Sequence, residues 1–208
     1  MTEMQAWPAE GVTIAILVLY EIALVLAQRL RPEQMARSAH ARLRQEWFEA
    51  VSSQVGSEIL AVQTLRNSMM SAMMMASTAA LGLMGTATLA VPLMHAGLGD
   101  PPLTPRLVLE MVLMGQLFAS LVSSAMSVRY FNHAGFITGI PAGSDARKHW
   151  MNTGSAYVKR AGILYSWSLR QLLLVAPLLV SLLHPLAGPP AALVVVGVVF
   201  AFDRFDPK

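Results

Sequence analysis

The chain has 208 residues, of which 55% are hydrophobic and only 13% are charged. Soluble domains carry about a quarter charged residues, so this composition excludes an ordinary water-soluble fold and indicates a membrane protein. Fifteen Lys and Arg residues against 12 Asp and Glu leave a formal charge of +3, and the absence of cysteine excludes disulfides, thiol catalysis and Cys-ligated metal centres.

Five apolar segments follow one another along the chain. A hydrocarbon core of about 30 Å needs ~20 helical residues, so we expect one all-α, polytopic helical membrane domain. The fifth segment has 12 residues, and a four-span arrangement with a re-entrant last segment therefore stays open. The third segment begins after Thr104 and Pro105, a typical N-cap and first-turn pair. The predicted spans are about 12–28, 69–93, 107–128, 163–183 and 191–202.

The positive charges fall on one side of this topology. With five spans, 13 of the 15 Lys and Arg residues lie on one side; Arg106 lies on the other and Arg170 lies within a span. Because basic loops stay in the cytoplasm, we expect the N-terminus outside and the C-terminus inside. Topology alone accounts for the basic residues, so no nucleic-acid partner is expected. The Ala, Leu, Val and Arg bias suggests a bacterial inner membrane.

Two inner segments connect the spans. Over about 37–56, Leu43, Trp47, Val51 and Val55 recur every four residues and predict an amphipathic helix. This helix would lie either on the membrane surface or against its own bundle. The segment from about 130 to 160 is rich in Gly, Asn and His and predicts a loop with short helical stretches. Its candidate functional residues are Asn132 and His133.

Small residues recur at every fourth position in spans two and three. They are Ala72, Ala76 and Ala80 in span two, and Gly115, Ala119 and Ser123 in span three. Small side chains let helix backbones approach closely in lipid, so we expect these two ridges to pair. Self-association through the same ridges is the alternative, which leaves a homo-oligomer or a partner membrane subunit open.

Polar residues within the apolar segments form a candidate cluster. Glu21 and Arg170 lie at the same depth by sequence, while Gln63, Arg66 and Asn67 enter span two from the same side. Each charge costs about 2.5–3.5 kcal/mol at a helix centre, which makes such residues candidates for function. We expect Glu21 to pair with Arg170. Arg66 would face a cytoplasm-open cavity or extend to the inner interface.

Metal and cofactor chemistry has little support in the sequence. Six methionines crowd span two and could ligate copper, although gap filling between helices explains them better. The five histidines are scattered, and no zinc, phosphate-loop or nucleophile motif occurs. We therefore expect no metal, no cofactor and no enzymatic activity. The methionines in question are Met69, Met70, Met73, Met74, Met75 and Met84.

Several stretches carry a resemblance to a known family. They are Leu60-Ala-Val-Gln-Thr-Leu-Arg-Asn-Ser68 with Ala76-Ser-Thr78, Arg129-Tyr-Phe-Asn-His133, Gly162-x-x-Tyr-Ser-x-x-Leu-Arg170 and Asp203-Arg204-Phe205-Asp206. From about Trp47 to Asp206 the chain resembles the family called domain of unknown function 599, small integral membrane proteins of bacteria and plants. The aromatic Trp-x-Phe-Gly-Pro turn of that family is replaced here by Leu183-His-Pro-Leu-Ala-Gly-Pro189. The resemblance implies fold and membrane location, and no activity.

Two functions are consistent with these observations. In the first, the protein is a structural or accessory membrane subunit held by small-residue packing and a buried polar network. In the second, it resembles a transporter or channel and binds a small anionic solute in a cytoplasm-open cavity, because arginines outnumber carboxylates in the polar cluster. The lipid bilayer is the one partner expected in both cases.

Overall fold

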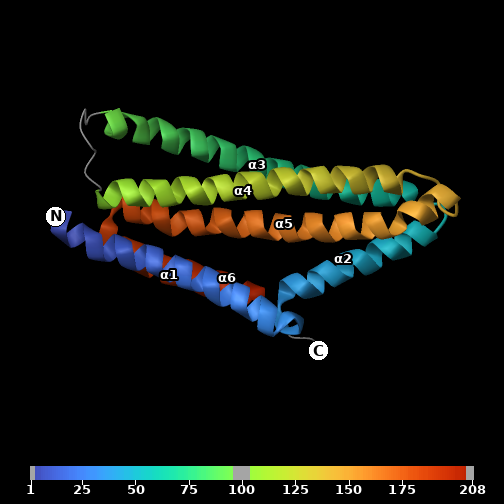
Figure 1. The fold of residues 1–208 in the computed structure, drawn as a ribbon, viewed down its shortest axis with the longest axis horizontal. Helices are drawn as coiled ribbons and strands as arrows, with labels where there is room; N and C mark the ends of the chain where they lie inside the picture. The colour runs from blue at the N-terminus through green and yellow to red at the C-terminus, as the bar shows by residue number, and fades with distance from the viewer. Residues whose placement is uncertain (1–2, 96–103, 205–208) are drawn as a thin grey trace.

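The fold is helical throughout the part of the chain that the computed structural model describes, residues 3–95 and 104–204, with side chains for 7–88 and 104–204. No strand occurs within these ranges, which confirms the all-α prediction; Phe205 and Asp206 of the last family-like stretch lie outside them. The helices are α1 (Glu3–Leu30), α2 (Ala36–Ser53), α3 (Glu58–His95), α4 (Pro105–Thr138), α5 (Asp145–Leu183) and α6 (Gly188–Asp203), with 3-10 turns η1 (Pro32–Gln34) and η2 (Pro185–Ala187) (Figure 1).

Five described stretches are long and apolar enough to cross a membrane: Trp7–Leu30, Glu58–Thr88, Pro105–Thr138, Asp145–Leu183 and Pro185–Asp203. The last of these runs beside α1 rather than turning back. Gly188, at the start of α6, lies against Thr13, and Asp203, at its end, accepts a hydrogen bond from the Tyr20 hydroxyl. α6 is therefore placed as a crossing helix, which favours five spans over the re-entrant alternative.

α4 and α5 continue well past the apolar segments. With 34 and 39 residues they are about 51 and 58 Å long, against a hydrocarbon core of about 30 Å. The predicted loop over 130–160 is therefore wrong: only residues 139–144 separate the two helices. Thr104 caps the start of α4 as expected, and Ser144 caps α5 by accepting a hydrogen bond from the Arg147 amide. Figure 1 shows these extensions meeting α2 and the start of α3; we call this end the α2 end.

A buried arginine closes the turn between α4 and α5. Arg147 is 1% exposed, and its guanidinium donates to the carbonyl oxygens of Ile137 and Ile140 and to the Ser52 hydroxyl. It therefore adds hydrogen bonds to Ile137, in the last turn of α4, and to Ile140, just beyond that helix. The turn is also fixed to α3, because the Ala142 amide donates to a Glu58 carboxylate oxygen.

Serines join α4 and α5 at their closest approach. The Ser120 and Ser168 hydroxyls lie 2.9 Å apart, and each lies 3.1 Å from the other residue's carbonyl oxygen. Seven residues further along α4, the Ser127 hydroxyl donates to the Ala161 carbonyl at 2.9 Å. Small residues seven apart on both helices match the 3.5-residue period of a coiled coil. Interhelical hydroxyl bonds add cohesion in a bilayer, where hydrophobic association is absent.

α3 packs against α4, but not through the predicted pair of ridges. The buried residues of α3 include Leu65, Ala72, Ala79 and Thr86, spaced by seven. Ala76 and Ala80 are half-buried, and on α4 Gly115 and Ala119 are exposed. A four-residue spacing drifts about 40° around a helix at each step, so such a ridge leaves the interface after one or two turns. Met70, Met73, Met74 and Met84 are exposed on the outer face of α3.

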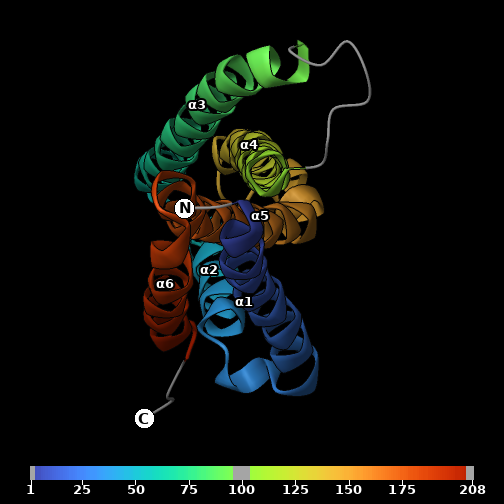
Figure 2. The ribbon, with the colours of Figure 1, turned by 90° about the vertical axis from the view of Figure 1, so that its left-hand side faces the viewer.

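α2 packs on α5, which resolves the alternative left open by the sequence. Its buried side chains include Ala41, Phe48, Val51 and Ser52, whereas Leu43 and Val55 of the predicted apolar face are exposed. Phe48 is fully buried against Gly154 of α5, where a Cβ atom would overlap its ring. Figure 2 shows α5 between α4 on one side and α1, α2 and α6 on the other.

Candidate functional site

The predicted polar cluster is divided between two regions of the bundle. Glu21 and Arg170 lie where α1, α5 and α6 meet. Gln63, Arg66 and Asn67 are exposed on α3, where Arg66 lines a groove with Phe131 and Asn132 of α4. The five residues therefore cannot line one cavity.

Arg170 pairs with Asp203 rather than with Glu21. Its guanidinium donates to the Asp203 carboxylate, which also accepts a hydrogen bond of 2.5 Å from the Tyr20 hydroxyl. Glu21 instead accepts a hydrogen bond of 3.0 Å from the Gln171 amide. The predicted pair is thus replaced by two adjacent contacts. Asp203 was not among the residues predicted for the polar cluster. A charged residue directly after an apolar segment usually marks only the end of the span, so nothing in the sequence indicates that Asp203 pairs with Arg170.

Asn132 and His133 lie on α4 rather than in a loop, and both are exposed. Asn132 shares with Arg66 a groove of about 240 Å³ between α3 and α4. The His133 ring lies 5.8 Å from the Tyr157 ring, centroid to centroid. The two predicted residues therefore lie side by side on the helix without forming a site of their own.

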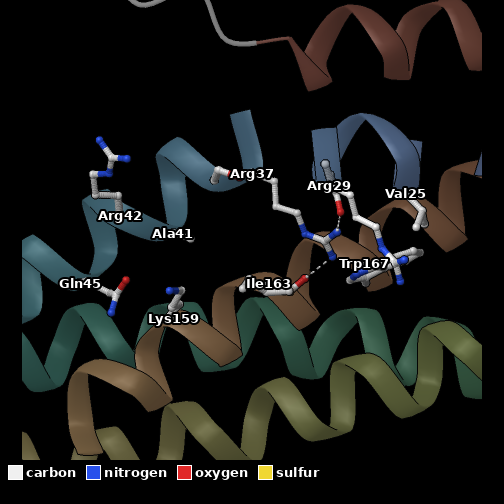
Figure 3. A pocket seen from close by; sticks show the side chains of 11 residues that line it. Val25, Arg29, Arg37, Ala41, Arg42, Gln45, Lys159, Ile163 and Trp167 are labelled. Carbon is white, nitrogen blue, oxygen red and sulfur yellow. Dashed lines mark hydrogen bonds between the residues drawn. The ribbon is translucent and has the colours of Figure 1, made fainter. Parts of the chain in front are cut away.

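A polar cavity lies where α1 ends and α2 begins, between α1, α2 and α5. Its volume is about 480 Å³, within the usual range for small-molecule sites, and it opens at the surface of the protein. Four of its lining residues are basic and none is acidic. Figure 3 shows the lining residues, which come from three helices. The lining residues are Val25, Gln28 and Arg29 of α1, Arg37, Ser38, Ala41, Arg42 and Gln45 of α2, and Lys159, Ile163 and Trp167 of α5. We call this cavity the basic pocket.

Arg37 is the fixed cation of the basic pocket. It donates to the Gln28 side-chain oxygen at 2.7 Å and to the Ile163 carbonyl at 3.4 Å, and its guanidinium carbon lies 4.7 Å from the Trp167 ring centre (Figure 3). Burial, and then the nearby charge of Arg170, lowers the pKa of Arg37 to about 10. The side chain therefore keeps its charge at neutral pH. Within the described residues, its Nε and the Gln28 Nε2 have no hydrogen-bond partner.

This arrangement suits an anion with an apolar part. Cations without a neighbouring carboxylate attract negative charge, and guanidinium groups bind carboxylate and phosphate oxygens with matched geometry. Val25, Ile163 and Trp167 provide an apolar floor beside the charges. The volume is several times that of an inorganic anion, so the pocket fits a small organic phosphate or carboxylate.

None of the basic-pocket residues was singled out from the sequence. The lining residues come from three segments separated by up to about 130 residues. Each basic residue among them, taken alone, has the pattern of an ordinary cation in an inner loop. One signal could have pointed to them: the positive-inside count places Arg29, Arg37, Arg42 and Lys159 on one side of the membrane.

The five helices that are long and apolar enough to cross a membrane indicate a polytopic helical membrane protein. The chain belongs to the family described as "Protein of unknown function, DUF599", which it matches over residues 9–208. This confirms the family that the sequence resembles and carries no activity. Comparison with curated proteins and with solved structures finds no match.

Proposed function

We propose that this membrane protein binds a small organic anion in the basic pocket at the cytoplasmic face. The observation that carries the proposal is the composition of the pocket: four cations from three helices, no acidic lining residue, and an apolar floor at Trp167. The role is one of binding, as in a transporter or a channel-like protein, rather than of catalysis.

The electrostatics support this proposal over a purely structural role for the pocket residues. Arg29, Arg42 and Lys159 are exposed at the mouth of the pocket, where they raise the local anion concentration. Arg37 is held deeper by Gln28 and Trp167, so an arriving anion meets a preorganised donor. By contrast, Arg170 does not line the basic pocket, and its ionic partner is Asp203.

We propose a bacterial inner membrane location with the N-terminus outside, based on the 13 basic residues expected on one side. In this orientation the basic pocket faces the cytoplasm. A reporter enzyme fused after Lys208, which lies outside the described residues, should then be active only in the cytoplasm. Periplasmic activity of that fusion would contradict the orientation.

Phenyl phosphate is a suitable probe, because it joins a dianionic group to an apolar ring. We expect isothermal titration calorimetry of the detergent-solubilised protein to show one site per chain for phenyl phosphate. Lys159→Gln should weaken binding by about 3- to 10-fold, since one charge-assisted contact at an open site contributes about 1 kcal/mol. Arg160→Gln is the matched control, because Arg160 is the neighbouring exposed cation and does not line the pocket.

Equal losses in the two variants would mean that general surface charge attracts the anion, and would contradict a specific pocket. A wild-type protein that binds no phenyl phosphate would favour the structural or accessory role instead. In that case the exposed outer face of α3, with Met70, Met74 and Leu81, would be the place to seek a partner helix or a second copy.

A further inference from the structure

A second cavity lies on the other side of Arg37, between α5, α6 and the start of α2. Its volume is about 430 Å³, and Arg37 lines both this cavity and the basic pocket. Polar side chains here include Arg37, His40 and Arg170, and apolar ones include Leu169, Leu173 and Phe202. We call this cavity the α5–α6 groove.

Polar and apolar residues are separated along the α5–α6 groove. Arg37 and His40 lie near the start of α2, whereas α5 leads away from the α2 end through Leu169 to Leu173. Leu169 and Leu173 are 43% and 44% exposed, on faces of a membrane helix that no other helix covers. Arg37 and His40 thus lie at the membrane-surface side of the groove. Arg170 lies between Leu169 and Leu173, and Leu173 is the deeper apolar residue.

Arg170 has unused donors in this groove. The residue is 4% exposed and one nitrogen of its guanidinium binds Asp203, but its Nε and Nη1 have no hydrogen-bond partner among the described residues. Buried polar groups are nearly always hydrogen-bonded, so two buried donors without a partner, on a residue that lines the groove, point to an absent acceptor. Among the residues that line the groove, two guanidinium groups face the single carboxylate of Asp203.

We propose that the α5–α6 groove binds the headgroup phosphate of an anionic phospholipid. The phosphate would accept hydrogen bonds from Arg170 and Arg37, and the acyl chains would lie along Leu169, Leu173 and Phe202. The apolar half of the groove and its opening toward the lipid-facing side favour a phospholipid over a free phosphate ion. This site shares Arg37 with the basic pocket but takes a different ligand, so it goes beyond the function proposed above.

Native mass spectrometry of the full-length protein after delipidation tests this inference. We expect wild-type protein to bind one phosphatidylglycerol per chain at least about tenfold more tightly than phosphatidylcholine. Both lipids carry the phosphate, but the quaternary ammonium of phosphatidylcholine would place a second positive charge beside the guanidinium of Arg37. Leu173→Trp should fill the apolar half of the groove and reduce binding by about tenfold or more. Leu179→Trp is the matched control, because Leu179 is 47% exposed on the same helix and does not line the groove.

Two further variants distinguish a loss of lipid binding from a loss of folding, and the α5–α6 groove from the basic pocket. His40→Glu changes an exposed groove residue, so it should preserve the fold and weaken phosphatidylglycerol binding even if Leu173→Trp does not fold. Lys159→Gln, which affects only the basic pocket, should leave lipid binding unchanged. Equal affinity for the two lipids, or full binding by both Leu173→Trp and His40→Glu, would overturn the inference. Displacement of the lipid by millimolar inorganic phosphate would also overturn it, in favour of a free phosphate site.

Discussion

Asp203→Asn should lower the free energy of unfolding by about 3–5 kcal/mol. The carboxylate of Asp203 is the ionic partner of Arg170, whose side chain is 5% exposed, and removal of one member of a buried pair leaves the other charge uncompensated. Arg170→Met should have a comparable effect, because it leaves Asp203 without its cation. Chemical denaturation in mixed micelles measures both changes.

The double variant Arg170→Met with Asp203→Leu should lose less stability than the sum of the single changes, because no charge remains buried alone. Glu21→Gln should be mild, since an amide oxygen can still accept the hydrogen bond from Gln171. A severe Glu21→Gln together with a silent Asp203→Asn would mean that Glu21 is the true partner of Arg170, as the sequence predicts.

Ser120→Leu should destabilise the protein by about 2–4 kcal/mol. The side chain is fully buried where α4 meets α5, so leucine both overpacks the contact and removes the hydroxyl bonds to Ser168. Ala119→Leu, one position along the same helix, should change stability by less than about 0.5 kcal/mol, because Ala119 is exposed. Thermal unfolding in detergent compares the two variants, and equal melting temperatures would show that α5 does not cover this face of α4.

The helical spans were predictable because their signal is local. An apolar run, a Thr-Pro helix start and a one-sided distribution of basic residues are each visible in a short window of sequence. The helix extensions beyond the bilayer were not visible in this way. Gly154 and Asn132 read as loop residues, whereas in the fold Gly154 makes room for Phe48 and Asn132 lies on the outer face of α4.

Helix faces were predicted less well than helix positions. The four-residue ridges at Ala72 and Gly115 and the α2 ridge at Leu43 drift around their helices, and each contributes only part of its length to an interface. The contacts between α3, α4 and α5 follow spacings of seven instead, as at Ser120 with Ser127. A search for small residues seven apart would have identified these packed faces.

The candidate site depends on contacts between distant segments, which a single sequence does not encode locally. The positions of Glu21 and Arg170 within their apolar segments correctly predicted that the two residues lie at a similar depth. Depth alone, however, does not show which helices are neighbours. Arg66 lines a groove between α3 and α4, whereas Arg170 pairs with Asp203 of α6, so the two arginines lie in different parts of the bundle. Arg37 and Trp167 meet only because α2 folds back along α5.

The central proposal is that an organic anion binds in the basic pocket. Trp167 lines this pocket, so its fluorescence can test whether the anion binds there. The protein has four tryptophans, so variants that keep only Trp167 or only Trp150 can report on two places separately. Trp167 lines the pocket, whereas Trp150 is 45% exposed on α5 and does not line it. We expect phenyl phosphate to cause a saturable change in the fluorescence of the Trp167-only protein and no change in the Trp150-only protein. A change confined to Trp150, or no saturable change at Trp167 while calorimetry detects binding, would contradict the proposed site.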